Sequence, residues 1–140
     1  MFDVNVMGLL NGIHIVLTGM IERKCGTIIN IGSVAGHKTF PAHTGYCGTK
    51  FAVHAITESM REEVCESDVR VMVIAPASVE AELMDHTTEK KIQQEFLDWF
   101  DSIGGRIPAR NVSESMLFAY EQPQQICIRE MVICPTRQQT

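Results

Sequence analysis

The sequence predicts an α/β fold in which a parallel β-sheet lies between two layers of helices. Three short apolar segments, Thr27–Ile31, Val69–Ala75 and Ile126–Ile133, alternate with longer segments of helical periodicity. Strands that are separated by helices usually join through right-handed crossovers and therefore run parallel. Continuous apolar character within the strands is typical of a sheet that is covered on both faces.

Two long segments are predicted to be helices that pack on this sheet. Residues 2–23 carry apolar side chains at close to helical spacing, and residues 45–66 offer a second apolar stripe. The apolar positions are Val6, Leu9, Leu10, Ile13, Val16, Leu17, Met20 and Ile21 in the first segment, and Phe51, Val53, Ile56, Met60 and Val64 in the second.

Two further helices are expected in the second half of the chain. Thr88 is a plausible N-cap for a helix that runs to about Phe100. Asn111, with Glu114 three residues later, resembles a capping box, which predicts a helix to about Gln122. The whole chain, residues 1–140, is then expected to form part of one domain.

Composition narrows the class of protein. The chain has 140 residues, of which 45% are hydrophobic and 21% charged, and its net charge is -5. These values argue against disorder, and no basic stripe predicts binding to nucleic acid. Lys and Arg are scattered, and the longest unbroken apolar run, Val71–Ala77, is too short to cross a bilayer, so no membrane partner is expected.

The five cysteines and five histidines do not predict a disulfide framework or a metal site. The cysteine number is odd and no Cys-x-x-Cys pair occurs, while the first residues lack the basic region of a signal peptide. Reduced thiols in a cytoplasmic protein are the simplest interpretation. No two histidines have a ligand spacing such as His-x-x-x-His, so we expect no metal.

Three residues form a pattern that is suited to acid–base chemistry. Ser33 follows the first predicted strand, and Tyr46 and Lys50 share one face at the start of the next helix, at i and i+4. A phenol normally keeps its proton up to about pH 10, but a neighbouring ammonium favours the phenolate. Such a tyrosine can exchange a proton with an alcohol near neutral pH, while Ser33 holds the same substrate oxygen.

These residues resemble a known family signature. Ser33, Tyr46 and Lys50 match the Ser…Tyr-x-x-x-Lys signature of the short-chain dehydrogenase/reductase family, and Asn5 matches its catalytic asparagine on the preceding helix. The neighbouring sequence also resembles that of the family, including residues 26–31, 33–36, 51–53 and 70–76. The resemblance covers essentially the whole chain and implies a three-layer, Rossmann-like fold.

The resemblance also implies a role for each residue. Tyr46 would be the general acid/base, and Ser33 would orient the reacting oxygen. Lys50 would favour the phenolate and bind the ribose hydroxyls of the nicotinamide cofactor, and Asn5 would anchor a water that relays protons to Lys50. The reaction would be hydride transfer between NAD(P) and a carbonyl or alcohol carbon.

The segment after the second strand is expected to complete the cofactor contacts. The family prefers Pro-Gly-x-Val-x-Thr there, whereas this chain has Ala77 for the glycine and Ala81 for the threonine. The loss of that threonine removes a hydroxyl contact to the carboxamide. Contacts from Pro76, Ala77 and Val79 are expected to remain, and NADP is favoured over NAD.

The family's Gly-rich phosphate-binding turn, Thr-Gly-x-x-x-Gly-x-Gly, does not occur in this sequence. We therefore expect residues 1–140 to be the C-terminal catalytic half of a single domain, with the N-terminal strands missing and with weak NAD(P) binding by this chain alone. Residues 80–110 match the family's variable region, which closes over a small apolar or hydroxylated carbonyl substrate. The helices at 2–23 and 45–66 are expected to pair in a homodimer or homotetramer.

Two other functions compete with this one. A non-catalytic dimerisation fragment would explain the missing phosphate-binding turn, although the intact set of four candidate catalytic residues argues against it. A serine hydrolase built on Ser33 should have the frame Gly-x-Ser-x-Gly. Here Gly32 directly precedes Ser33, so the frame is wrong.

Overall fold

The chain folds around a three-stranded parallel sheet, as the sequence predicts. In the computed structural model the described residues are 1–81 and 90–139. The strands are β1 (Gly26–Ile31), β2 (Val69–Pro76) and β3 (Glu130–Ile133), in the order β1-β2-β3. Thr27 pairs with Arg70 and Val73 pairs with Glu130, and both strand pairs are parallel.

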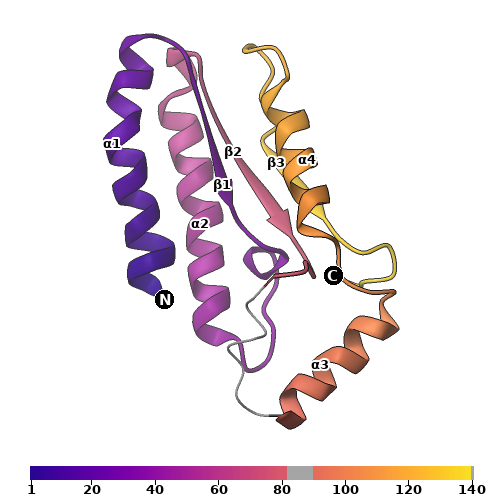
Figure 1. Cartoon of the computed structure of the whole chain (residues 1–140). Coiled ribbons are helices and arrows are strands. Elements are labelled where there is room, and N and C mark those ends of the chain that lie inside the picture. Colours follow the sequence, from indigo (N-terminus) through magenta and orange to yellow (C-terminus); the bar gives the residue numbers. More distant parts are fainter. Residues whose placement is uncertain (82–89, 140) are drawn as a thin grey trace.

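Among the described residues, α-helices cover both faces of the sheet. Figure 1 shows the strands between α1 (Gly8–Glu22) and α2 (Thr44–Glu63) on one side and α4 (Ala109–Tyr120) on the other. The helix α3 (Lys90–Ser102) projects away from this body. A π-helical turn η1 (Asp3–Met7) precedes α1, and two short 3-10 turns, η2 (Val34–Gly36) and η3 (Cys65–Ser67), flank α2. The layers place the ends of β1 and β2 beside the start of α2.

The core lies between the sheet and the pair α1 and α2. Strand β2 is the central strand and is buried along nearly its whole length, which explains its unbroken apolar sequence. Each large apolar side chain that is fully buried in such a core stabilises the fold by about 1.5–3 kcal/mol relative to exposure. The buried cluster consists of Ile13, Ile28, Met60, Val64, Val69 and Val71, with Leu9, Leu17, Met20 and Ile56 packed around it.

The predicted capping box at Asn111 is wrong. Helix α4 begins three residues earlier, with Pro108 in the N-cap position, and no side chain caps it. Pro108 has an extended backbone (φ -56°, ψ 136°), and its carbonyl accepts a hydrogen bond from the N–H of Asn111. The proline therefore sets the start of the helix, and Glu114 pairs with Arg110 instead. Helix α3 is confirmed, but its predicted cap, Thr88, lies outside the described residues.

The third strand is shorter than the sequence predicts, because residues 126–129 do not form a regular ladder with β2. Side chains bind this segment instead. The Arg70 guanidinium donates to the carbonyl of Ile126 (3.5 Å), and the Cys127 thiol donates to the carbonyl of Val71 (3.5 Å). The carbonyl of Arg129 accepts from the N–H of Val73, and strand pairing begins at Glu130.

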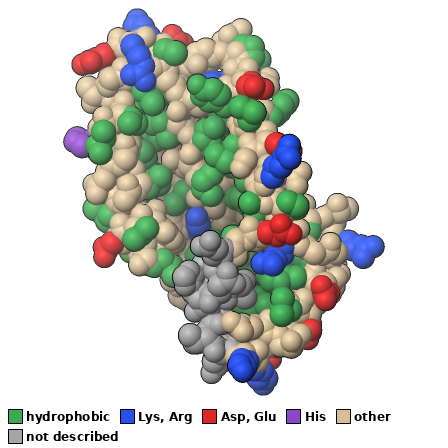
Figure 2. Space-filling view, viewed as in Figure 1, with side chains coloured by type: hydrophobic (Ala, Val, Ile, Leu, Met, Phe, Trp, Pro, Cys, Tyr) green, Lys and Arg blue, Asp and Glu red, His purple; other side chains and the backbone are tan. Residues whose placement is uncertain are grey.

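The helical stretch Asp3–Glu22 is long and apolar enough to cross a bilayer, although it has no long unbroken apolar run. Within it, 18 consecutive residues have a mean hydropathy of 1.6, and only 6% of them are buried. Its inward side nevertheless packs on the core through Leu9, Ile13 and Leu17. Figure 2, viewed as in Figure 1 with α1 at its left edge, shows further hydrophobic side chains in the middle of the visible face and most charged groups around its margin. The exposed apolar side chains of the stretch Asp3–Glu22 therefore need an explanation beyond the core of this chain.

Candidate active site

Ser33 lies directly beyond β1, at the carboxyl end of the sheet. The N–H of Gly32 still donates to the carbonyl of Ile74 on β2 (2.8 Å), so the sheet extends to the residue before the serine. Ser33 is buried and caps η2, and its Oγ accepts a hydrogen bond from the N–H of Ala35 (3.1 Å). A hydroxyl has one proton to donate, and this arrangement leaves that proton available to a substrate oxygen.

Tyr46 and Lys50 extend from the first turns of α2 to the same end of the sheet. The Lys50 ammonium donates to the carbonyl of Ile31, the last residue of β1 (2.9 Å). Its Nζ lies 5.7 Å from the centroid of the Tyr46 ring. Burial lowers the pKa of Lys50 below its usual 10.5, because desolvation disfavours the ammonium. The structure thus brings the predicted lysine, the predicted tyrosine and the end of β1 together.

Asn5 reaches the site through Thr49, which matches the family sequence but was given no role in the sequence analysis. Its amide Nδ2 donates to Oγ1 of Thr49 (3.1 Å), and this hydroxyl donates to the carbonyl of Tyr46 (2.8 Å). Thr49 is fully buried. Asn5 is therefore tied to the backbone of the tyrosine, which fixes the start of α2 against η1. A buried threonine at a helix start carries no distinct signal in a single sequence.

In the segment after β2, the structure shows which backbone groups bond within the fold and which way those of Val79 point. The N–H of Ala77 donates to the carbonyl of Ile133 (2.8 Å), so it is already used within the fold. Val79 forms an isolated parallel bridge with Ile107, in which the carbonyl of Ser78 and the N–H of Glu80 bond to Ile107. Backbone groups of alternate residues in an extended chain point to opposite sides, so those of Val79 face away from Ile107. Pro76, which ends β2, has no N–H to offer.

A second polar cluster adjoins Ser33. The ring nitrogen Nε2 of His37 lies 2.8 Å from Oε1 of Glu130, and Nδ1 of His54 lies 3.2 Å from the same oxygen. The three possible metal-ligand atoms lie within 4.8 Å of one another. The spacing of histidines in the sequence does not reveal this cluster, because its members come from a loop, α2 and β3. The cluster lines a hollow of about 760 Å3.

A hollow of about 550 Å3 lies beyond the sheet, between residues 103–108 and 134–137. None of the four candidate catalytic residues lines it. It begins next to the bridge between Val79 and Ile107, within the segment 80–110 that was predicted to close over substrate. Residues 82–89 of that segment lie outside the described residues.

Comparison with protein families identifies this arrangement. The family described as short chain dehydrogenase matches residues 1–92, which carry Asn5, Ser33, Tyr46 and Lys50. The chain belongs to the short chain dehydrogenase family. An uncharacterized oxidoreductase of Staphylococcus saprophyticus is 38% identical to this chain over 140 residues, 99% of the chain and 56% of the relative. An uncharacterized oxidoreductase of Listeria monocytogenes is 34% identical with the same coverage.

Solved structures of short chain dehydrogenases share the fold. The closed form of a serine dehydrogenase in complex with NADP+ superposes with a TM-score of 0.89 at 28% identity, over 100% of this chain and 56% of that one. A 4-hydroxyisoleucine dehydrogenase in complex with NADH, 23% identical, has a TM-score of 0.80 over 98% of this chain and 58% of its own length. The chain therefore spans about half the length of the relatives that it matches.

Proposed function

We propose that this chain carries the catalytic residues of an NAD(P)-dependent oxidoreductase that acts on a carbonyl or alcohol group. The observation that carries the proposal is the position of Lys50 beside both the Tyr46 ring and the end of β1, two residues before Ser33. Lys50 bonds to the last strand carbonyl and lies 5.7 Å from the tyrosine ring. The bound nicotinamide would supply hydride transfer, which no side chain can perform.

Tyr46 would exchange the proton with the substrate oxygen. The charge of Lys50 favours the phenolate, and the backbone of Tyr46 is fixed through Thr49 and Asn5. Ser33 would donate its free hydroxyl proton to the same oxygen and thereby orient it. Positioning of this kind lowers the activation barrier, because the reacting groups are already held together and lose no further translational or rotational entropy.

The described residues fit the nicotinamide-ribose end of the cofactor. An ammonium has three N–H donors, and Lys50 uses one on the carbonyl of Ile31, so others remain for ribose hydroxyls. The backbone groups of Val79 would meet the carboxamide, with Pro76 and Ala77 beside it. We favour NADP over NAD because the serine dehydrogenase structure that resembles this chain at 28% identity contains NADP+.

Asn5 would act on the site by holding α2 in place and, as the resemblance implies, by anchoring a water that leads to Lys50. The substrate would be a small apolar or hydroxylated carbonyl compound or the matching alcohol. Small hydroxyamino acids such as serine belong in a first panel, because a similar enzyme is named a serine dehydrogenase.

A graft tests the proposal, because the chain spans 56% of the serine dehydrogenase that it resembles. Residues 1–140 replace the matching part of that enzyme, and NADP+ reduction is followed with a panel of small alcohols. We expect turnover that Tyr46→Phe lowers at least about 100-fold, since general acid–base catalysis contributes 10²–10⁴. NADP+ should still bind to the Tyr46→Phe graft. Equal turnover by the two grafts would refute the assignment of Tyr46.

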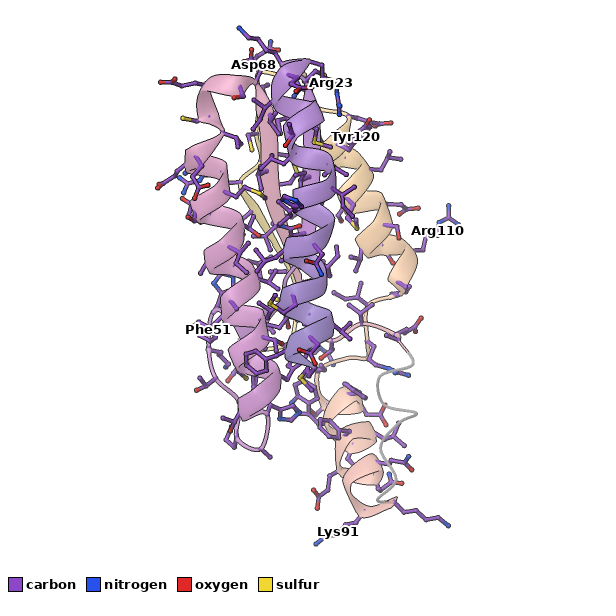
Figure 3. All side chains as sticks on the ribbon, turned by 90° about the vertical axis from the view of Figure 1, so that its left-hand side faces the viewer. Arg23, Phe51, Asp68, Lys91, Arg110 and Tyr120 are labelled. Carbon is purple, nitrogen blue, oxygen red and sulfur yellow. The ribbon has the colours of Figure 1, made fainter. Side chains whose placement is uncertain are left out.

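A second candidate function is self-association through α1 and α2, with or without catalysis. Figure 3 shows these two helices side by side on one face of the molecule, with Phe51 on α2. Phe51 is 41% exposed and Ile15 on α1 is 78% exposed. Large exposed apolar areas mark interaction surfaces, so we propose a homodimer or homotetramer that buries this face.

Sedimentation of the chain tests this candidate. The double variant Ile15→Ser and Phe51→Ser should shift the mass toward the monomer, whereas Leu97→Ser should leave it unchanged. Leu97 is a matched control because it is 50% exposed but lies on α3. A monomeric wild-type chain at high concentration would remove this candidate.

A further inference from the structure

The imidazole of His54 occupies a notch directly beneath the loop that carries Ser33. Gly32 and Gly36 form the walls of the notch, and a Cβ at either position would collide with the ring. The side chain of His54 is only 12% exposed. The two glycines thus make room for a ring in this place, and the serine loop rests on it.

Both nitrogens of the ring have partners, and these partners define its orientation. The N–H of Ser33 donates to Nε2 (3.3 Å), and Nδ1 lies 3.2 Å from Oε1 of Glu130. A ring turned by half a rotation would place carbon atoms against both groups and lose both hydrogen bonds. The observed orientation is therefore the one that the surroundings stabilise.

The partners also define the tautomer. Because the N–H of Ser33 is a donor, Nε2 must present a lone pair, and the proton of the neutral ring is on Nδ1. Nδ1–H then donates to Glu130, whose Oε1 also faces Nε2 of His37 (2.8 Å). The result is a chain of hydrogen bonds from β3 through α2 to the backbone of Ser33.

We infer that His54 is a positioning residue for Ser33, and that Glu130 sets the tautomer in which His54 accepts the serine N–H. This inference rests on the proposed function, because Ser33 matters only if its hydroxyl orients the substrate. His54 itself touches neither substrate nor cofactor. It fixes the peptide that carries Ser33, and hence the direction of the hydroxyl that Ala35 already restrains.

The same three side chains would not hold a metal in this arrangement. A metal on Nδ1 of His54 would move the ring proton to Nε2, where it would face the N–H of Ser33. Histidines that bind metals normally donate from the other nitrogen to an acceptor, and here a donor occupies that place. The hydrogen-bonded chain and metal binding therefore exclude each other.

Protonation of His54 has the same effect as a metal, because a charged imidazole has N–H on both nitrogens. The charged and titratable groups that face the ring are Glu130 on β3, His37 after η2, and Lys50 on α2. Burial of the ring lowers the pKa of His54, and the carboxylate of Glu130 opposes this effect. The bond to Ser33 is thus kept at neutral pH and lost in acid.

Nuclear magnetic resonance of the full chain tests the inference without any turnover. Ring ¹⁵N shifts should show His54 with its proton on Nδ1 at pH 7.5. The Ser33 amide should move on acidification with the same midpoint as the His54 ring. His54→Gln should keep the Ser33 amide near its wild-type position, because the carboxamide can accept from Ser33 and donate to Glu130. His54→Leu should shift it, and His14→Gln, an exposed control on α1, should not.

Three results would overturn the inference. The first is a proton on Nε2 of His54, and the second is a Ser33 amide shift that does not change when His54 titrates. The third is Zn²⁺ binding at pH 7.5 that is lost in His37→Ala and Glu130→Gln. None of these depends on catalysis. In the grafted enzyme, His54→Leu should lower kcat about tenfold or more through misplacement of Ser33, with His54→Gln partly restoring it. An inactive graft with the expected tautomer would refute the proposed function and leave the hydrogen-bonded chain intact.

Discussion

Arg70 is the buried charge on which the packing of α4 most depends. It lies on β2 with 5% of its surface exposed. Its guanidinium donates to Oγ1 of Thr27 (3.0 Å) and to the carbonyls of Gln122 and Tyr120 (both 2.8 Å). These carbonyls lie at the C-terminal end of α4, where a positive charge is favourable. We expect Arg70→Met to loosen this end of α4 from the sheet.

The expected cost follows from the three short hydrogen bonds. Each acceptor left without a partner costs about 1–3 kcal/mol when it is buried. Water can partly hydrate the carbonyls beyond α4, and the methionine side chain fills some of the volume of the arginine, so both effects reduce the cost. We therefore expect the free energy of unfolding to fall by about 3–5 kcal/mol in total. A domain of this size has a free energy of unfolding of about 5–15 kcal/mol, so the variant should be close to unfolding.

Urea unfolding followed by circular dichroism measures this loss, with Arg110→Met as the matched control. Arg110 has a side chain that is 86% exposed and a single ion pair with Glu114, at i and i+4. Its removal should cost about 0.5 kcal/mol or less. A loss below about 1 kcal/mol for Arg70→Met, or equal losses for the two variants, would show that the guanidinium does not anchor α4.

Three further predictions concern the site and its support. Gly36→Ala should lower the melting temperature through a loss of about 1–3 kcal/mol, because its methyl group would collide with His54; an unchanged melting temperature would contradict the close fit. Thr57→Val should cost about 1–3 kcal/mol in urea unfolding, because the Thr57 hydroxyl is the buried acceptor for the Asn30 amide (2.8 Å), and Thr57→Ser should recover most of it. Burial lowers the pKa of Lys50 from 10.5 in the folded chain. Between the folded-state pKa and 10.5 the unfolded chain therefore binds more protons, so the free energy of unfolding should rise with pH in this range. Lys50→Met should remove that rise, and identical pH profiles for this variant and the wild type would refute the assignment.

The order of elements and the three residues of the signature could be predicted from the sequence because both are local patterns. Apolar patterns located β1, β2, α1 and α2, and candidate caps indicated α3 and α4. Ser33 could be predicted because it follows a strand, and Tyr46 and Lys50 because they are spaced at i and i+4 on one helix. The start of α4 was predicted wrongly because Asn111 has a capping composition, whereas the backbone of Pro108 fixes the true start.

The supporting residues could not be predicted because their partners are distant in sequence. Thr49 and His54 look like ordinary positions of an amphipathic helix until Asn5 and Glu130 are placed beside them. Arg70 lies within an apolar strand, where a charge would normally predict a solvent-facing position. Its partners at the end of α4 follow it by 50 or more residues, and Thr27 precedes it by 43. Only the tertiary fold shows that it binds the end of α4.

The parallel sheet also determines how this chain must fold. Thr27 and Arg70, which pair across β1 and β2, are 43 residues apart, and the contact between Val71 and Cys127 spans 56 residues. Closing such long loops costs entropy before any strand pairing can compensate, so the sheet should form late and slowly. Helix α1 can form earlier from local hydrogen bonds. During synthesis, the apolar surface of α1 should therefore be exposed until β2 has been made, which makes this helix a binding site for chaperones.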